Sequence, residues 1–153
     1  MSQDRIERSI TLKAPRSRVW QALTSAPEFG QWFQARLDGE TFAPGQQARG
    51  PITVPGFEHI QFDATVETME PESLFSFRWH PYPVGDGFDA ATEPTTLVEF
   101  TLADTDDGGT RLTVVESGFD KIPAHRRDEA YRMNSGGWEG QMRNIAAHVD
   151  KAG

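Results

Sequence analysis

The sequence of 153 residues contains no cysteine. This absence excludes disulfides, thiolate nucleophiles and metal sites with cysteine ligands. Long hydrophobic runs are also missing, because no stretch approaches the roughly 20 apolar residues that span a bilayer. The first residues, Met1–Ile6, contain no apolar core of a signal peptide. We therefore expect a cytoplasmic protein that is not bound to a membrane.

Positive charge is scarce and scattered. The chain has 15 lysines and arginines against 23 aspartates and glutamates, which gives a formal net charge of -8. Nucleic acids and anionic membranes are bound through a concentrated positive field. Neither nucleic acid nor a membrane surface is therefore an expected partner.

Recognisable metal and catalytic motifs are missing too. No two of the four histidines have the spacing of a helical metal motif; they are His59, His80, His125 and His148. The chain has no Gly-x-Ser-x-Gly motif, and Gly85-Asp86-Gly87 carries a carboxylate where a phosphate loop needs bare backbone donors. We predict no metal, no cofactor and no assigned catalytic residue.

The composition is that of one folded domain spanning residues 1–153. Hydrophobic residues make up 37% and charged residues 25% of the chain, without a linker or an internal repeat. A chain of this length buries about 70% of its unfolded surface. One substantial core is expected.

Apolar residues alternate with a period of two in several segments, which is typical of antiparallel strands. The first such segment is 5–13. The later alternating sets are Ile60, Phe62, Ala64 and Val66; Phe75, Phe77 and Trp79; Val98, Phe100 and Leu102; Leu112 and Val114. Asp106–Gly109 is a turn signal between the last two strands. We expect the first strand and about six later strands, in a mostly meander-like antiparallel sheet.

Helical signals occupy the two ends of this β region. Ala14-Pro15 and Ala26-Pro27 predict the starts of two short helices. After Pro123 the apolar period becomes that of a helix running to about Asp150, with Tyr131, Trp138, Met142, Ile145 and Val149 on one face. The segregation of strands and helices predicts an α+β fold.

The Gly136-Gly137 pair lies inside this last predicted helix. Each glycine costs a helix roughly 1 kcal/mol relative to alanine. The pair therefore indicates close approach of a strand or room for a ligand.

Four groups of residues, in this order and spacing, resemble the SRPBCC or START-like helix-grip superfamily, and within it the bacterial relatives of the activator of heat-shock protein 90 ATPase. They are Ile10–Pro15 with Val19–Leu23, Pro27-Glu28 with Trp32-Phe33, Gly109–Phe119, and Gly136–Trp138. The resemblance implies an antiparallel sheet of about seven strands that grips the C-terminal helix around an elongated cavity. Members of the superfamily bind lipids, hormones or antibiotics, cyclise polyketides, or serve as chaperone cofactors, so the fold alone does not choose among these activities.

Glu116 is the polar residue of greatest interest. Counting by two from Leu112 and Val114 places it on the inward face of the last strand, where a carboxylate is a candidate acid or base. The alternative that we favour is a frayed strand end, where Glu116 pairs with an arginine at the rim. Arg78 and His80 point outward if Trp79 points inward, and a register shift of one residue would reverse this.

We predict binding of a small apolar molecule in an internal cavity, without covalent chemistry. The predicted lining residues are Phe62, Phe77, Trp79, Phe100, Glu116, Asn134, Trp138 and Met142. The segment Pro81–Thr96 is either a lid over this cavity or a mobile insertion. The alternatives are a chaperone-associated protein-binding module, as monomer or homodimer, and a cyclase-like enzyme that uses Glu116 or an arginine.

Overall fold

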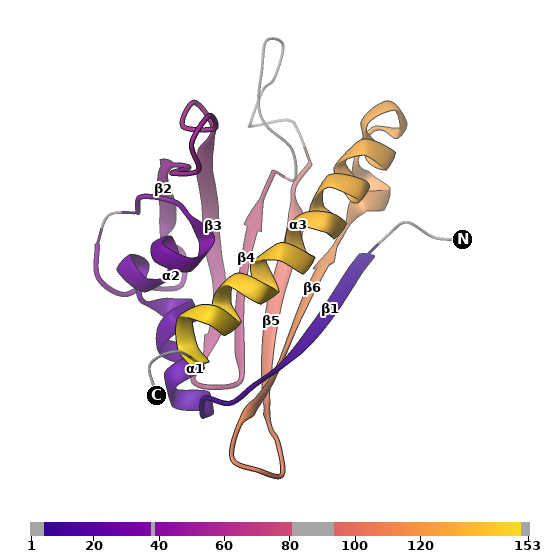
Figure 1. Cartoon of the computed structure of the whole chain (residues 1–153). Helices are drawn as coiled ribbons and strands as arrows, with labels where there is room; N and C mark the ends of the chain where they lie inside the picture. Colours follow the sequence, from indigo (N-terminus) through magenta and orange to yellow (C-terminus); the bar gives the residue numbers. More distant parts are fainter. Residues whose placement is uncertain (1–4, 38, 81–93, 151–153) are drawn as a thin grey trace.

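The computed structural model describes residues 5–37, 39–80 and 94–150. Figure 1 shows one antiparallel sheet crossed by a long C-terminal helix. The elements in chain order are β1 (Arg5–Leu12), α1 (Arg16–Thr24), α2 (Ala26–Phe33), β2 (Gln47–Pro51), β3 (Gln61–Glu70), β4 (Leu74–Trp79), β5 (Thr96–Asp104), β6 (Thr110–Ser117), a short 3-10 turn η1 (Phe119–Lys121) and α3 (Ala124–Asp150). The predicted α+β class is confirmed.

The sheet has the order β1-β6-β5-β4-β3-β2, and all its neighbours are antiparallel. The chain therefore runs as a meander from β2 to β6, and β1 is added beside β6 at the far edge. The described residues form six strands, whereas the family resemblance implied about seven. The Asp106–Gly109 turn joins β5 to β6, as its sequence predicts.

The two short helices begin at the Ala-Pro pairs. Pro15 is the N-cap of α1, so it lies just outside the helix rather than at its first position. In α2 the hydroxyl of Ser25 accepts a hydrogen bond from the backbone nitrogen of Glu28, and a proline occupies the first turn. Gln34 ends α2 in a left-handed conformation with φ of 72°.

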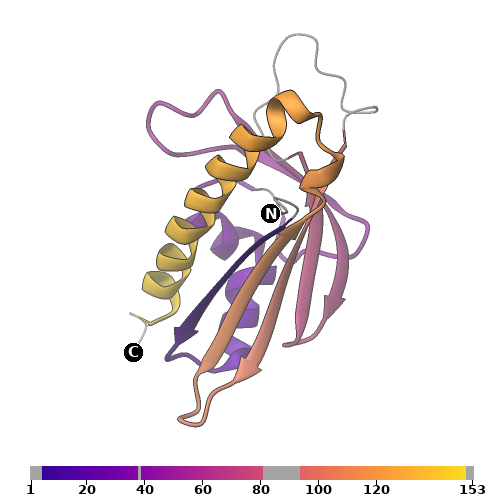
Figure 2. The same ribbon diagram turned by 90° about the vertical axis from the view of Figure 1, so that its right-hand side faces the viewer.

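Helix α3 lies across the face of the sheet that also carries α1 and α2 (Figure 2). Its C-terminal end is held by Asp150, whose Oδ1 accepts hydrogen bonds from the backbone nitrogens of Lys13 (3.1 Å) and Ala14 (3.3 Å). Near its N-terminal end the Tyr131 hydroxyl donates to the carbonyl of Arg5 (3.0 Å). None of the helices in the described ranges has the length and hydrophobicity of a transmembrane span.

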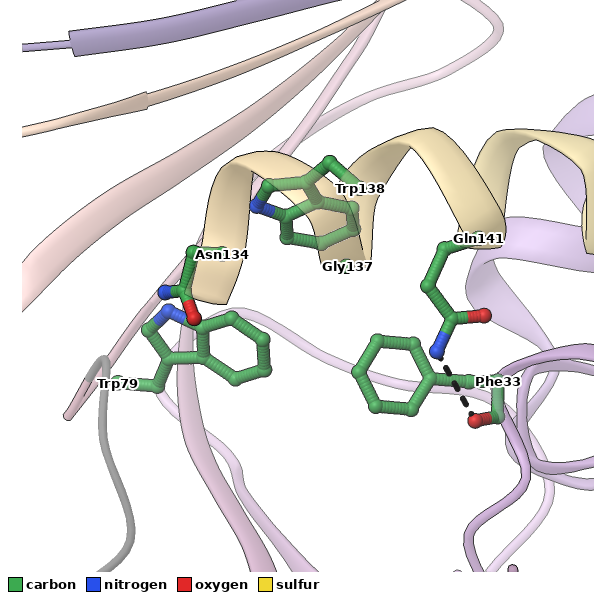
Figure 3. Close-up of a pocket in the computed structure, with 6 residues that line it drawn as sticks. All are labelled: Phe33, Trp79, Asn134, Gly137, Trp138 and Gln141. Carbon is green, nitrogen blue, oxygen red and sulfur yellow. Dashed lines mark hydrogen bonds between the residues drawn. The ribbon is translucent and has the colours of Figure 1, made fainter. Parts of the chain in front are cut away.

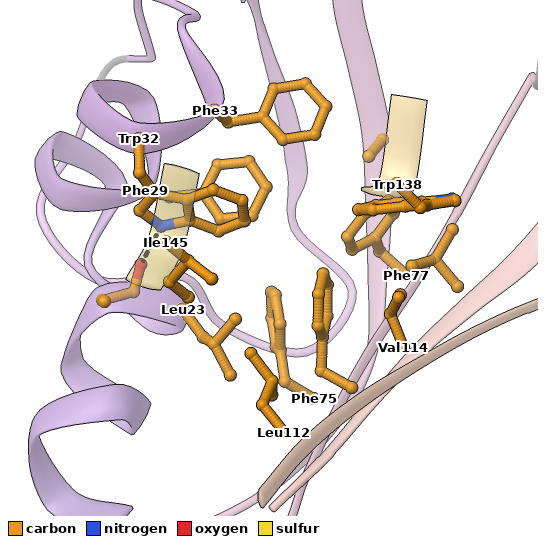
Figure 4. Packing of buried hydrophobic residues seen from close by; sticks show 14 of the residues in the cluster. Leu23, Phe29, Trp32, Phe33, Phe75, Phe77, Leu112, Val114, Trp138 and Ile145 are labelled. Atoms are coloured by element: carbon orange, nitrogen blue, oxygen red, sulfur yellow. Dashed lines mark hydrogen bonds between the residues drawn. The ribbon is translucent and has the colours of Figure 1, made fainter. Parts of the chain in front are cut away.

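Aromatic side chains fill much of the space between the sheet and the helices (Figure 4). Phe29 of α2 is 1% exposed and lies at the centre of this cluster. Its ring contacts Trp32, Phe33, Phe42, Phe62 and Phe77 at centroid distances of 4.7–6.4 Å. The elongated internal cavity implied by the resemblance is thus largely replaced by packed aromatic rings.

Candidate ligand-binding site

Space remains where α3 passes over the end of α2 and the last residue of β4. A pocket of about 170 Å³ lies there, lined by Phe33, Trp79, Asn134, Gly137, Trp138 and Gln141. Figure 3 shows these residues around the middle of α3. The pocket is close in size to a cavity of about 150 Å³ that holds benzene.

Three aromatic rings form the walls of the pocket. Trp79 and Trp138 have centroids 5.7 Å apart and planes tilted by 32°. Phe33 meets Trp79 at 6.0 Å and Trp138 at 6.3 Å, in both cases edge to face. Such walls bind flat apolar molecules through large contact areas and ring-edge contacts.

The α3 wall of the pocket contains a turn rich in glycine. Apart from its chain neighbours and the backbone of its own helix, a Cβ atom added at Gly136, Gly137 or Gly140 would have no described atom within 4 Å. Of the two explanations for the glycine pair, close approach of a strand is therefore not seen in the described part of the chain. Open space beside the helix is what the structure places there.

Glu116 of β6 lies behind the tryptophans and is fully buried. Its carboxylate accepts the indole N–H of Trp79 (2.8 Å) and of Trp138 (2.8 Å), and the hydroxyl of Thr96 (2.5 Å). The amide nitrogen of Asn134 lies 3.0 and 3.1 Å from the two carboxylate oxygens. Donors from β4, β5 and α3 thus converge on one buried group.

The pKa of Glu116 is raised above its ordinary value. Burial is the largest cause, because it disfavours the charged form. The hydrogen bonds from Thr96, Trp79, Trp138 and Asn134 act in the opposite direction and stabilise the carboxylate, but they do not cancel the effect of burial.

The predicted pairing of Glu116 with an arginine at a frayed rim is wrong. The residue pairs with Ile6 on one side and Val98 on the other, so its strand is held from both sides at that point. Neutral donors surround the carboxylate in place of a guanidinium. Arg78 points outward, where its guanidinium donates to the exposed carboxylate of Glu67 (3.1 Å).

The predicted lining residues divide into two groups. Trp79, Asn134 and Trp138 line the pocket, and Glu116 connects all three from behind. The others are buried in the aromatic and aliphatic core and are absent from the pocket lining; they are Phe62, Phe77, Phe100 and Met142. Whether the first group binds a ligand stays a prediction.

Three lining residues are absent from the predicted list: Phe33, Gln141 and Gly137, the last of which the sequence marks only through the Gly136-Gly137 pair. Phe33 ends α2, and the Gln141 amide nitrogen donates to the Phe33 carbonyl at 3.2 Å, which joins α3 to α2. Thr96, the buried partner of Glu116, was missed as well. The sequence signal for Gln141 is its position one turn after Gly137 and Trp138 on the same helix.

No group of three or more metal-binding side chains occurs within the residues that the structure describes. His148 pairs with Glu28 across 2.9 Å, and Glu28 also accepts from Arg18 at 2.6 Å. A second open pocket lies beside this ion-pair cluster, lined by Gln31, Trp32, Gln34, Asn144, Ala147 and His148. Most of the predicted lid, residues 81–93, lies outside the described residues.

The sequence model of the family described as "Activator of Hsp90 ATPase homolog 1-like protein" matches residues 13–150. The chain belongs to this family. The resemblance recognised in the sequence motifs is thereby confirmed. A comparison with curated proteins found no match.

Several solved structures have the same fold. Protein MLL2253 from Mesorhizobium loti is 23% identical, with a TM-score of 0.76 over 97% of this chain and 98% of that one. The Aha1 dimer from Colwellia psychrerythraea is 15% identical, with a TM-score of 0.68 over 95% and 96%. DynU16, a protein in the dynemicin biosynthetic locus, is 25% identical, with a TM-score of 0.72; the match covers 97% of this chain but 48% of DynU16, about half of its length.

Proposed function

We propose that this protein binds a small, flat, largely apolar molecule of one or two rings in the pocket beside α3, without covalent chemistry. The observation that carries the proposal is the pocket itself, with three aromatic walls and a glycine turn that leaves its space open. Apolar pockets with a few fixed polar groups are the usual form of small-molecule sites.

Catalysis by Glu116 is less well supported than binding. The carboxylate is fully buried, and its two oxygens already accept hydrogen bonds from four side chains. A general acid or base needs hydrogen-bond reach to the substrate. In this arrangement Trp79 and Trp138 stand between Glu116 and the pocket, so Glu116 acts on the pocket walls rather than on a ligand.

A chaperone-associated role rests on the family description. Its structural mark would be a large exposed apolar patch. In the described ranges the large hydrophobic side chains that are exposed are Phe57, in the loop before β3, and Met133, on α3. The geometry therefore supports a small-molecule ligand better than a protein partner.

The test is a thermal-shift screen with native mass spectrometry, using fatty acids, sterols, flavonoids and one-ring and two-ring aromatics. Aromatic probes should raise the melting temperature in proportion to the logarithm of their concentration, because a ligand that binds only the folded state stabilises it. A protein indifferent to every class would overturn the proposal.

Two matched variants locate the effect. Gly137→Leu adds a side chain that fills the pocket, and Gly136→Leu adds the same side chain next to it, outside the pocket lining. Both positions are exposed and gain similar helix propensity. Ligand stabilisation should disappear in Gly137→Leu and persist in Gly136→Leu; equal binding by the two variants would contradict the assignment of this pocket.

A further inference from the structure

The side chains that line the pocket have few polar atoms, and nearly all of them are already paired. The indole N–H groups of Trp79 and Trp138 both donate to Glu116. The Gln141 nitrogen donates to the Phe33 carbonyl, and its oxygen accepts from Asn144 at 3.0 Å. These bonds use the single N–H of each indole and engage both polar atoms of Gln141, whose amide nitrogen keeps a second N–H. Each of these atoms is therefore already held by a partner within the protein.

Asn134 is the exception. Its amide nitrogen is turned toward the Glu116 carboxylate, and within the described residues its oxygen makes no hydrogen bond. In Figure 3 the nitrogen lies on the outer side of the drawn side chains and the oxygen on the side of Trp79. Asn134 Oδ1 is thus the unpaired polar side-chain atom of the lining.

The orientation of this amide is fixed by chemistry. An asparagine can usually be turned over with little change in shape, so its hydrogen-bond partners decide which end points where. The ionised form of Glu116 only accepts hydrogen bonds, and in this form it holds the nitrogen and not the oxygen of Asn134. The pocket is left with a hydrogen-bond acceptor.

We propose that the pocket recognises a hydrogen-bond donor on its ligand through Asn134 Oδ1, so that the preferred class is an aromatic molecule bearing a hydroxyl or N–H group. In this arrangement Glu116 is a positioning residue for Asn134, Trp79 and Trp138. The inference rests on the proposed function, because it names the ligand class of the same pocket.

Two probes of matched shape test it: para-fluorophenol and para-fluorotoluene, titrated into the wild-type protein by fluorine NMR. A methyl group is buried more easily than a hydroxyl, so a pocket without a suitable acceptor would favour the toluene. We expect the phenol to bind roughly tenfold more tightly, the gain of one well-placed hydrogen bond. Preference for the toluene, equal binding, or no binding of either probe would overturn the inference and leave the proposed function standing. The proposed function falls as well only if the thermal-shift screen also finds no ligand.

Asn134→Leu removes the acceptor and should reverse the preference in favour of the toluene. Glu116→Gln is the second variant, because its new amide nitrogen can donate to Asn134 Oδ1 and turn the Asn134 nitrogen toward the pocket. The same nitrogen cannot accept a hydrogen bond, so the variant also loses the bond from one of the two indoles. This variant should prefer para-fluorobenzaldehyde, which only accepts hydrogen bonds, over the phenol. Circular dichroism confirms that each variant is folded; a folded Asn134→Leu protein that still prefers the phenol would contradict the role of Asn134.

Discussion

Glu116 is a carboxylate buried among hydrogen-bond donors, and both of its protonation states carry a cost. The ionised form loses its hydration, and the protonated form no longer offers two full acceptors to the donors around it. Its hydrogen bonds connect β4, β5 and α3. A change of charge on this carboxyl group therefore alters the hydrogen bonds of both tryptophans.

The raised pKa of Glu116 predicts how the stability of the protein changes with pH. Between the unfolded-state pKa of about 4.3 and the higher folded-state pKa, the folded protein binds more protons than the unfolded chain. The contribution of Glu116 to the free energy of unfolding should therefore fall as pH rises through this window. Urea titrations of the wild type and Glu116→Gln from about pH 4 to about pH 8 measure this contribution. If the free energy of unfolding of the wild type minus that of the variant increased with pH, the raised pKa would be contradicted.

Glu28 provides a contrast with the opposite sign. Its hydrogen bonds and charge interactions with His148 and Arg18 outweigh the effect of burial and lower its pKa. Its stabilising contribution should be present above the unfolded-state pKa of about 4.3 and be lost as pH falls through the lower folded-state value. The stability difference between the wild type and Glu28→Gln, measured by the same titrations, should shrink on acidification; a constant difference would show that Glu28 is not coupled to its partners.

Residue patterns in the sequence located part of the site. Strand periodicity placed Glu116 on the inward face, and helix periodicity placed Trp138 inward, so these two were predicted separately. Their hydrogen bond was not predicted, since it depends on how α3 crosses the sheet. Phe33 and Gln141 were missed for the same reason: their proximity is set by the docking of α2 against α3.

At the scale of elements, α3 is a helix of 27 residues with three glycines close together, at positions 136, 137 and 140. Glycine weakens a helix, and in this helix it also leaves the pocket side uncovered. At this turn, side chains that would strengthen the helix would also occupy the space open to a ligand.

Glycines elsewhere in the fold serve a different purpose, and substitutions distinguish the two. Gly140→Ala places its Cβ in open space and should stabilise the protein by up to about 1 kcal/mol through helix propensity. Gly30→Ala brings Cβ within 2.3 Å of the Ala35 carbonyl oxygen and should destabilise by about 1–3 kcal/mol. Urea denaturation of both variants measures the signs; stabilisation by Gly30→Ala would contradict the packing at the end of α2.

Most elements could be predicted from periodicity, but β2 could not be delimited. Its sequence, QARGP, has no apolar alternation beyond Ala48. The strand exists because β3 offers a partner, and because Gly50 allows the backbone to approach the Arg36 carbonyl, where a Cβ would lie 1.7 Å away. Such tertiary requirements leave little trace in a local pattern.

For the molecule as a whole, the first and the last strand of the chain are neighbours in the sheet. β1 pairs with β6, so that Ile6 lies opposite Glu116 in the sheet. The helices between and after the strands then cover one face of the sheet. The edge that carries β1 can form only after the chain has closed a very long loop.

This topology predicts slow folding for a chain of its size. Sheets dominated by pairing between distant residues fold in roughly milliseconds to seconds, because loop-closure entropy opposes their formation. Stopped-flow refolding followed by tryptophan fluorescence measures the rate. Complete refolding within microseconds would show that the β1–β6 pairing does not limit the reaction.

The contact between Trp79 and Trp138 has an optical consequence. Two indoles 5.7 Å apart, held at a 32° tilt by a shared carboxylate, are close enough for their electronic transitions to couple. Circular dichroism should therefore show a pair of bands of opposite sign that is lost in Trp79→Phe and kept in Trp20→Phe. A molecule that enters the pocket and alters the angle between the rings would change this signal, so the protein carries a built-in, label-free reporter of its own occupancy.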